Sequence, residues 1–235
     1  MIKALSVEKI RKVEEAAKKI GLTERILIEN ASSNLASIID NLNLGKKVCV
    51  VAGRGNNGAD VLACARKLAA KNYKVYAVIV REKNFNEEVK FQKELLDKIK
   101  IPVCVIGPGN KKKLKKYLKA SNFVLDGILG IGVKGEVSGF LKKIISEINK
   151  SGKKIVSCDI PSGLSPDSGV ILGEAIKADY TITFIAPKKG FLLNSGLRFC
   201  GRIYVADIGI SKDMLKKAEG KDKTKNQNAK IKTTN

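Results

Sequence analysis

The sequence contains no histidine and no tryptophan, and only 5% of its 235 residues are aromatic. Without histidine, a Ser-His-Asp triad, imidazole acid–base catalysis and histidine-ligated metal sites are all excluded. Proton transfer would have to use Asp, Glu, Lys, Tyr, Cys or water. Because aromatic side chains are scarce, aliphatic residues must fill the interior, and the hydrophobic share of 44% is enough for a substantial core.

Long apolar runs and closely spaced cysteines are also missing. No run approaches the ~20 apolar residues that a membrane-spanning helix needs. The amphipathic N-terminal segment lacks the apolar stretch of a signal peptide. The five cysteines are far apart and form no CxxC motif, which argues against a disulfide framework or a zinc site. We therefore expect a cytoplasmic protein that does not enter the membrane.

Acidic residues are few relative to basic ones: 23 Asp and Glu stand against 45 Lys and Arg, for a formal net charge of +22. Such a surface attracts nucleotides, nucleic acids and acidic membranes. The lysines are scattered, however, and the densest run, at residues 111–116, has no interleaved aromatics of the kind that bind single-stranded nucleic acid. We interpret the charge mainly as a solvated lysine-rich surface and do not expect nucleic acid as a partner.

Helical periodicity in the first 45 residues gives way to short apolar β-rich runs that alternate with helical segments. Ser6 and Thr23 are the candidate N-caps of the first two helices. The alternation predicts a Rossmann-like three-layer α/β/α sandwich with a mainly parallel sheet. We expect one domain over residues 1–218 and a disordered basic tail over 219–235, which has almost nothing to bury. The expected strands lie within 47–52, 73–80, 102–106, 122–129, 154–159, 180–185 and 202–208.

A glycine loop, GRGNNGAD at residues 53–60, follows the first expected strand. Ligands of an open α/β sheet bind beyond the carboxyl ends of its strands. Glycines let the backbone approach a phosphate, and the N-terminus of the following helix favours an anion. The amides of Asn56 and Asn57 suit a polar ligand or a hard cation. Glu82 stands where a ribose-binding acid would lie, so an NAD-dependent dehydrogenase is a competing interpretation.

Three further strand ends carry polar residues. Asp126 interrupts an apolar run and precedes a second glycine loop at residues 130–135. Asp159 ends the next run, just before the turn that contains Ser162, and Lys188 follows the run at 180–185. Each residue alone is compatible with an ordinary turn, but together they predict one polar site at the rim of the sheet. Oxygen ligands from Asn57, Asp126 and Ser162 would suit K⁺ or Mg²⁺ better than zinc.

Five motifs, in order, resemble those of the NAD(P)HX epimerase family: GRGNNGAD, LDGILGIGVKG, DIPSGLSPDSG, ADYTITFIAPKKG and DIGI. The resemblance spans about residues 5–210 and includes Ile28-Glu29-Asn30-Ala31. It implies a homodimeric isomerase that interconverts the R and S hydrates of NADH and NADPH, which differ at C6 of the nicotinamide ring, in metabolite repair. Its functional partner would be an ADP- or ATP-dependent NAD(P)HX dehydratase.

The resemblance also implies the roles of the site residues. Asp126 and Lys188 are expected to act as the catalytic acid–base pair, with loss of the C6 hydroxyl and return of water to a ring iminium. K⁺ would be the cofactor, held by Asn57, Asp126 and Ser162. Substrate contacts are expected from two loops and one strand end: Asn56, Asn57, Gly58, Ala59, Asp60, Gly130, Ile131, Gly132, Val133, Lys134, Gly135, Glu136 and Asp159.

Two residues depart from the family's GNNGGDG pattern, because Ala59 and Val61 stand where the family has glycine. Ala59 is compatible with the start of a helix, whereas Val61 adds bulk that can narrow the pocket. The alternative is therefore a non-catalytic nucleotide- or RNA-binding scaffold with the same fold, as in relatives within mRNA-decapping scaffolds. Such a scaffold would not need Asp126 and Lys188, and both are present.

Overall fold

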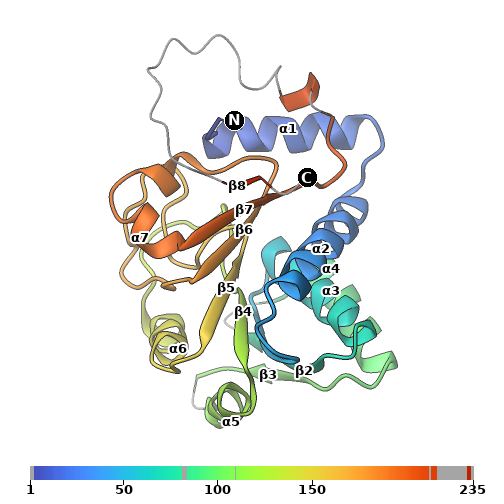
Figure 1. Ribbon diagram of the computed structural model, residues 1–235, viewed down its shortest axis with the longest axis vertical. Coiled ribbons are helices and arrows are strands. Elements are labelled where there is room, and N and C mark those ends of the chain that lie inside the picture. Colours follow the sequence, from blue (N-terminus) through green and yellow to red (C-terminus); the bar gives the residue numbers. More distant parts are fainter. Residues whose placement is uncertain (1–2, 81–83, 109, 212, 216–231, 234–235) are drawn as a thin grey trace.

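The computed structural model describes residues 3–80, 84–108, 110–211, 213–215 and 232–233. Within these residues, one parallel sheet has the strand order β3-β2-β1-β4-β5-β6-β7-β8, with helices on both of its faces (Figure 1). Every neighbouring pair of strands is parallel. The predicted Rossmann-like α/β/α arrangement is confirmed.

The strands closely follow the apolar runs of the sequence. A two-residue strand, β8 (Lys232–Thr233), pairs with β7 inside the segment 219–235 that we expected to be disordered. The other residues of that segment lie outside the described part of the chain. The remaining strands are β1 Lys47–Ala52, β2 Lys74–Val80, β3 Val103–Ile106, β4 Phe123–Gly127, β5 Lys154–Cys158, β6 Tyr180–Phe184 and β7 Arg202–Ala206.

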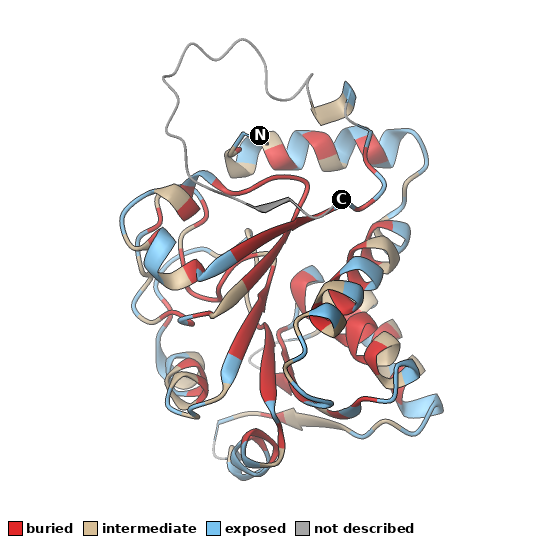
Figure 2. Ribbon diagram, in the orientation of Figure 1, coloured by how far each residue is buried: buried red, intermediate tan, exposed pale blue. Residues whose placement is uncertain are grey.

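Two hydrophobic layers cover the two faces of the sheet. Along β1, Val50 and Ala52 belong to one layer, and Cys49 and Val51 belong to the other. Successive side chains of a strand point to opposite faces, so a strand covered on both sides must be apolar throughout. Figure 2 shows the strands buried along most of their length.

One face of the sheet carries four of the helices and the other face carries two. Ser6 and Thr23 cap the first two helices, as predicted. No helix in the described ranges combines the length and the apolarity needed to cross a bilayer. The first face is covered by α1 Val7–Lys19, α2 Glu24–Asn41, α3 Asn56–Ala70 and α4 Glu87–Lys98. The second face is covered by α5 Lys112–Ala120 and α6 Gly139–Asn149. Between β6 and β7 the chain forms two short helices, η1 Lys189–Leu192 and α7 Gly196–Cys200.

The topology places a crevice at the carboxyl end of β1. The chain leaves β1 toward β2 on one side and later returns to pair β4 on the other, so the strand order reverses at β1. Ligands of doubly wound sheets bind at such a switch point. The segment before α1 is joined to the exit of β6, since Leu5 N donates to Pro187 O at 2.8 Å and Lys189 N donates to Leu5 O at 2.9 Å. This connection places α1 beside the crevice.

Candidate functional site

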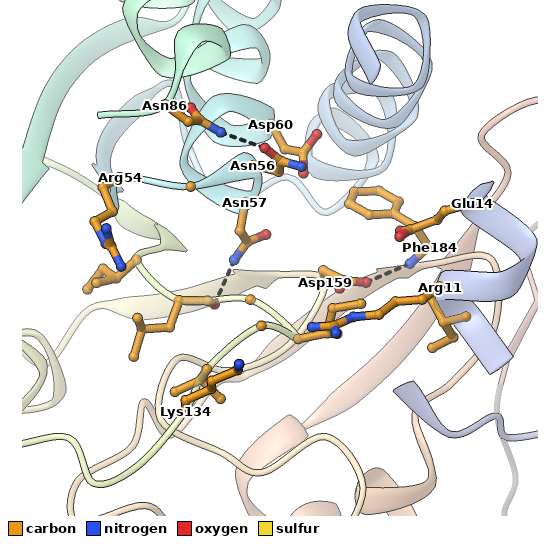
Figure 3. Close-up of a pocket in the computed structure, with 18 of the residues that line it drawn as sticks. Arg11, Glu14, Arg54, Asn56, Asn57, Asp60, Asn86, Lys134, Asp159 and Phe184 are labelled. Atoms are coloured by element: carbon orange, nitrogen blue, oxygen red, sulfur yellow. Dashed lines mark hydrogen bonds between the residues drawn. The ribbon is translucent and has the colours of Figure 1, made fainter. Parts of the chain in front are cut away.

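A cavity of about 920 Å³ opens at the carboxyl ends of the central strands (Figure 3). Its walls come from α1, the first turn of α3, the loop at residues 128–138 and the exits of β5 and β6. The volume is in the range of cavities that hold cofactors and other small molecules. The edge of the sheet at which the site was predicted therefore contains a cavity and is not closed by packed side chains.

The first glycine loop is packed tightly against the exit of β4. A Cβ atom on Gly53 would lie 1.8 Å from the carbonyl oxygen of Ile128, so only glycine fits there. In contrast, a Cβ atom on Gly55 would meet nothing within 4 Å in the part of the chain that the structure describes. Gly55 is the N-cap of α3 and offers no capping side chain. The first backbone N–H groups of α3 therefore remain available to an anion in the cavity.

The residues predicted to hold a cation meet around Leu129. Asn57 Nδ2 donates to the carbonyl oxygen of Leu129 at 2.8 Å, and Leu129 N donates to Ser162 Oγ at 2.8 Å. Ser162 Oγ in turn donates to Asp126 Oδ1 at 2.6 Å. The Oδ1 atom of Asn57 is buried and has no hydrogen-bond partner among the described residues. An orphaned acceptor of this kind is rare and fits an unseen positive partner.

Asp126 lies behind the cavity wall. Its side chain is fully buried, and its carboxylate also accepts from Ser157 Oγ at 2.9 Å and from the backbone N–H groups of Ser162 and Ile128. Burial raises the pKa of Asp126, whereas the hydrogen bonds from Ser162, Ile128 and Ser157 lower it. Asp126 is not among the residues that line the cavity.

Lys188 lines the cavity and pairs with Asp159. Only 1% of Lys188 is exposed, and its Nζ donates to Thr183 Oγ1 at 2.7 Å, to the carbonyl oxygen of Phe184 at 3.2 Å and to Asp159 Oδ1. Asp159 also accepts from Thr183 Oγ1 and from Phe184 N. The predicted partner of Lys188 was Asp126, but the structure brings Lys188 and Asp159 together instead.

Asp159 has a backbone φ of 62°, which is uncommon for a residue other than glycine. Its peptide N–H donates to Ile182 O at 2.8 Å, so the exit of β5 is held to β6 in this conformation. Strained backbone that surrounding contacts maintain is frequent at functional sites. The strain turns the Asp159 carboxylate toward Lys188.

Further carboxyl groups share the cavity with this pair, and Asp60 and Glu14 are two of them. Burial raises the pKa of Asp60 well above its usual value, and Asp159, Glu14 and Glu24 add to the effect. Burial also raises the pKa of Glu14, as does Asp159, while Lys188 opposes the shift. The site can therefore hold a proton on a carboxyl group under conditions in which an exposed carboxyl is ionised.

Glu14 is a site residue that the sequence did not reveal. It comes from α1, which is far along the chain from the glycine loops, and it faces the cavity together with Arg11 (Figure 3). The only signal in the sequence was its place beside Val13 and Ala17 on the buried face of an amphipathic helix. That signal does not distinguish a site residue from an ordinary flanking charge.

The second glycine loop forms one wall of the cavity. A Cβ atom on Gly130 would lie 3.1 Å from Cβ of Asn57, and Gly135 adopts a φ of +74°. All the loop residues predicted to contact substrate line the cavity, as do Asn56, Asn57, Asp60, Asp159 and Lys188. Gly58, Ala59, Asp126 and Ser162 are buried and do not line it.

Val61 does not narrow the cavity. Its side chain is fully buried against Gly127, where an added Cβ would lie 2.5 Å from Val61 Cγ1. Ala59 is fully buried as well. Both departures from the family's glycines therefore face the interior, because positions 59 and 61 point away from the ligand side of α3.

Glu82, the acid of the dehydrogenase interpretation, lies outside the described residues. Next to it, Asn84, Phe85 and Asn86 line the cavity, and Asn86 Nδ2 donates to Asn56 Oδ1 at 2.6 Å. Among the described residues, no group of three or more His, Cys, Asp or Glu side chains could hold a metal ion. A cation here would depend mainly on amide, hydroxyl and carbonyl oxygens, with Asp126 as a single carboxylate ligand.

Comparison with known proteins identifies related chains over nearly the whole length. The family described as "YjeF-related protein N-terminus" matches residues 24–190. The chain is 36% identical to the NAD(P)H-hydrate epimerase of Elusimicrobium minutum, over 92% of this chain and 100% of that one. It is 35% identical to the bifunctional NAD(P)H-hydrate repair enzyme of Thermofilum pendens, over 95% of this chain but only 43% of the relative.

A solved structure has the same fold. The crystal structure of yeast ynu0 superposes with a TM-score of 0.77 at 25% identity and covers 97% of both chains.

Proposed function

Because the chain belongs to the family of YjeF-related protein N-termini, the family of the NAD(P)HX epimerases, we propose that it is an isomerase in metabolite repair. It interconverts the R and S forms of hydrated NADH and NADPH. One observation carries the proposal: the cavity at the switch point places the buried Lys188–Asp159 pair and the uncapped N-terminus of α3 in the same hollow.

The cavity offers complementary groups for the two parts of this substrate. The open backbone at Gly55 and at the second glycine loop allows close approach of the phosphates. The dihydronicotinamide hydrate lies at the Lys188–Asp159 end, where ionisable groups face the cavity. This arrangement puts the reacting C6 carbon next to the groups that can move a proton.

We propose that Lys188 and Asp159 form the acid–base pair of the reaction. Lys188 gives a proton to the C6 hydroxyl, the C6–O bond breaks, and water leaves a ring iminium. A water molecule then adds to the opposite face of C6, and its proton passes to the pair, which restores the starting protonation state. Asp126 orients Ser162 and the backbone N–H of Ile128, a role that its complete burial supports.

We infer that K⁺ is the cofactor, held by Asn57, Asp126 and Ser162. The orphaned Oδ1 atom of Asn57, which lies beside the Leu129 carbonyl bonded to its own Nδ2, supports this fit. Oxygen donors suit a hard cation. The bound ion would supply a fixed positive charge beside the glycine loops, where an anionic ligand binds.

Potassium binding is testable by thermal unfolding. A ligand that binds only the folded state adds about 2.7 kcal/mol at a hundred times its Kd. We expect Tm to rise with KCl but not with NaCl of equal ionic strength, and we expect Asn57→Ala to abolish the difference. Asn41→Ala, an exposed amide at the end of α2, is the matched control. Equal Tm values in both salts would contradict the assignment.

We also propose a homodimer in the cytoplasm that works with an ADP- or ATP-dependent NAD(P)HX dehydratase. Exposed apolar side chains of Val170, Leu193 and Leu197 lie on adjoining segments, and this supports an interface there. The chain spans only 43% of the bifunctional repair enzyme that it resembles, which leaves that relative room for a second activity. The scaffold alternative is not favoured, because the relatives named here are a repair enzyme and an epimerase.

The deciding experiment is a time course on mixed R- and S-NADHX with excess S-specific dehydratase and K⁺, following the absorbance of regenerated NADH. We expect this protein to remove the slow R phase, and Lys188→Met to leave it in place. If the R form decays only at its spontaneous rate in the presence of the wild-type protein, the epimerase proposal is wrong.

A further inference from the structure

Helix α1 directs three charged side chains into the cavity from outside the glycine loops, those of Arg11, Glu14 and Lys18. Arg11 and Glu14 lie three residues apart and both line the cavity (Figure 3). They do not pair with each other, although residues at this spacing on a helix are close enough to do so. Both residues precede the range 24–190 that the family match covers.

Arg11 differs from other charged residues of the same helix. Lys12 pairs with Glu8 at 2.6 Å, and Lys18 pairs with Glu24 at 2.6 Å. Within the described part of the chain, the Arg11 guanidinium has no hydrogen bond and no ion pair. Of the described atoms, a Cβ placed on Gly132 would meet only Nη2 of Arg11 within 4 Å, at 3.9 Å. The Arg11 guanidinium therefore lies beside Gly132 of the second glycine loop.

The charges of the cavity are separated. Glu14, Asp60 and Asp159 are coupled to one another near Lys188, as the raised pKa values of Glu14 and Asp60 indicate. Basic residues predominate at the other end: Arg11 and Lys134 lie at the loop around Gly132, which also carries Glu136, and Arg54 of the first glycine loop also lines the cavity. A ligand with a neutral polar ring at one end and a dianionic group at the other would match this separation.

We propose that Arg11 is a substrate-binding residue that holds the pyrophosphate of the dinucleotide against the second glycine loop. The planar guanidinium matches phosphate oxygens in a bidentate geometry, and the glycines leave the facing surface open. The inference rests on the proposed function and deepens it, because it orients the substrate: the pyrophosphate lies under Arg11 and the nicotinamide hydrate lies against Lys188 and Asp159.

The test uses ADP-ribose, which contains the pyrophosphate and lacks the nicotinamide, so binding is measured independently of epimerisation. Titration calorimetry on the full chain compares wild type, Arg11→Gln and Arg11→Lys. Loss of a charge-assisted hydrogen bond predicts a Kd that is roughly tenfold higher for Arg11→Gln, with partial rescue in Arg11→Lys. Arg198→Gln removes the same charge from α7, away from the cavity, and is expected to keep the wild-type Kd.

The epimerase assay supplies a second readout. If Arg11 binds the pyrophosphate, Arg11→Gln raises KM for NADHX and NADPHX by the same factor and leaves kcat nearly unchanged. An increase confined to NADPHX would assign Arg11 to the 2′-phosphate and overturn the proposal. So would unchanged ADP-ribose binding in Arg11→Gln, an equal loss in Arg198→Gln, or no binding of ADP-ribose by wild type. None of these outcomes removes epimerase activity from the wild-type protein, so the two proposals fail separately.

Discussion

Lys188 is a buried ammonium group that donates hydrogen bonds to three neighbours. Asp159 supplies the opposite charge, and Thr183 and Phe184 supply oxygen acceptors. A buried pair is a weak source of net stability, but removal of one partner leaves an uncompensated charge. The two side chains also differ in exposure: 14% of the Asp159 side chain is exposed, compared with only 1% of the Lys188 side chain.

This difference in exposure predicts that the two single variants lose different amounts of stability. Asp159→Ala strands the buried ammonium and should lower the free energy of unfolding by about 3 kcal/mol. Lys188→Met retains the length of the side chain and should cost less stability, while it lowers kcat by roughly 100-fold or more. Urea unfolding and the coupled epimerase assay measure both effects. If Asp159→Ala has the same free energy of unfolding as wild type, Asp159 does not stabilise the charge of Lys188.

Asp60 connects the site to the pH dependence of stability. Its pKa is raised mainly by burial, so between pH 4 and its folded pKa the folded state binds a proton that the unfolded chain has lost. Stability therefore falls as pH rises through this range. Asp60→Asn cannot ionise, and we expect it to unfold at a higher Tm than wild type at pH 8, with a gap that narrows toward pH 5.

Glu15→Gln serves as the control for this prediction, because it removes one negative charge from an exposed position on α1. The difference in Tm between Glu15→Gln and wild type should be the same at pH 5 and at pH 8. If Asp60→Asn behaves in the same way as Glu15→Gln, the carboxyl of Asp60 does not carry the proposed pH dependence.

At the scale of elements, α2 positions the site through two of its side chains. Asn30 Nδ2 donates to the carbonyl oxygen of Ile208 at 2.9 Å and so holds the DIGI segment after β7. Glu29 accepts from Arg66 at 2.6 Å and from Lys67 at 2.5 Å, both on α3. Because the N-terminus of α3 faces the cavity, the Glu29 contacts help to hold the first glycine loop in place.

Glu29→Gln tests the link between these helices. Burial raises the pKa of Glu29, but Lys67 and Arg66 outweigh it and hold the pKa at about 2. The ion pairs of Glu29 therefore stabilise the fold at pH values above the pKa that Glu29 has in the unfolded chain. This contribution disappears as pH falls toward 2. Since 37% of the Glu29 side chain is exposed, we expect a loss of only about 1 kcal/mol at pH 7, and a smaller loss at pH 3.

Urea unfolding of Glu29→Gln at the two pH values measures this contribution. Glu87→Gln removes a carboxylate that is 82% exposed and paired with Lys90, and it should change stability very little. A loss for Glu29→Gln that is the same at pH 7 and pH 3 would mean that the ion pairs with α3 are not responsible.

At the scale of the whole molecule, the exposed apolar surface around α7 bears on assembly. Leu197 is 58% exposed, and Val170 and Leu193 are exposed beside it on segments joined by the bond from Ser195 N to Gly169 O. We expect light scattering to give twice the chain's 25.5 kDa, and Leu197→Asp to shift the protein toward the monomer. Ile99→Asp, at the end of α4, is the control on a different surface; a monomeric wild type would contradict the proposal.

The sequence by itself determined the parallel α/β/α fold, because continuous apolar strands and amphipathic helices are local patterns of the chain. It also predicted where the candidate site lies, since parallel strands deliver their polar exits to one edge of the sheet. Asn57, Asp126 and Ser162 were expected together on that basis, and they meet around Leu129.

Only the tertiary structure decided which acid faces Lys188 and which helix closes the cavity. Asp126 and Asp159 both end apolar runs, and the difference between them arises from the bonds that Asp126 makes to Ser157 and Ser162 and from the left-handed backbone of Asp159. Arg11 and Glu14 reach the site because backbone bonds join the segment before α1 to the exit of β6. Such contacts join residues far apart in the chain, so no local periodicity encodes them.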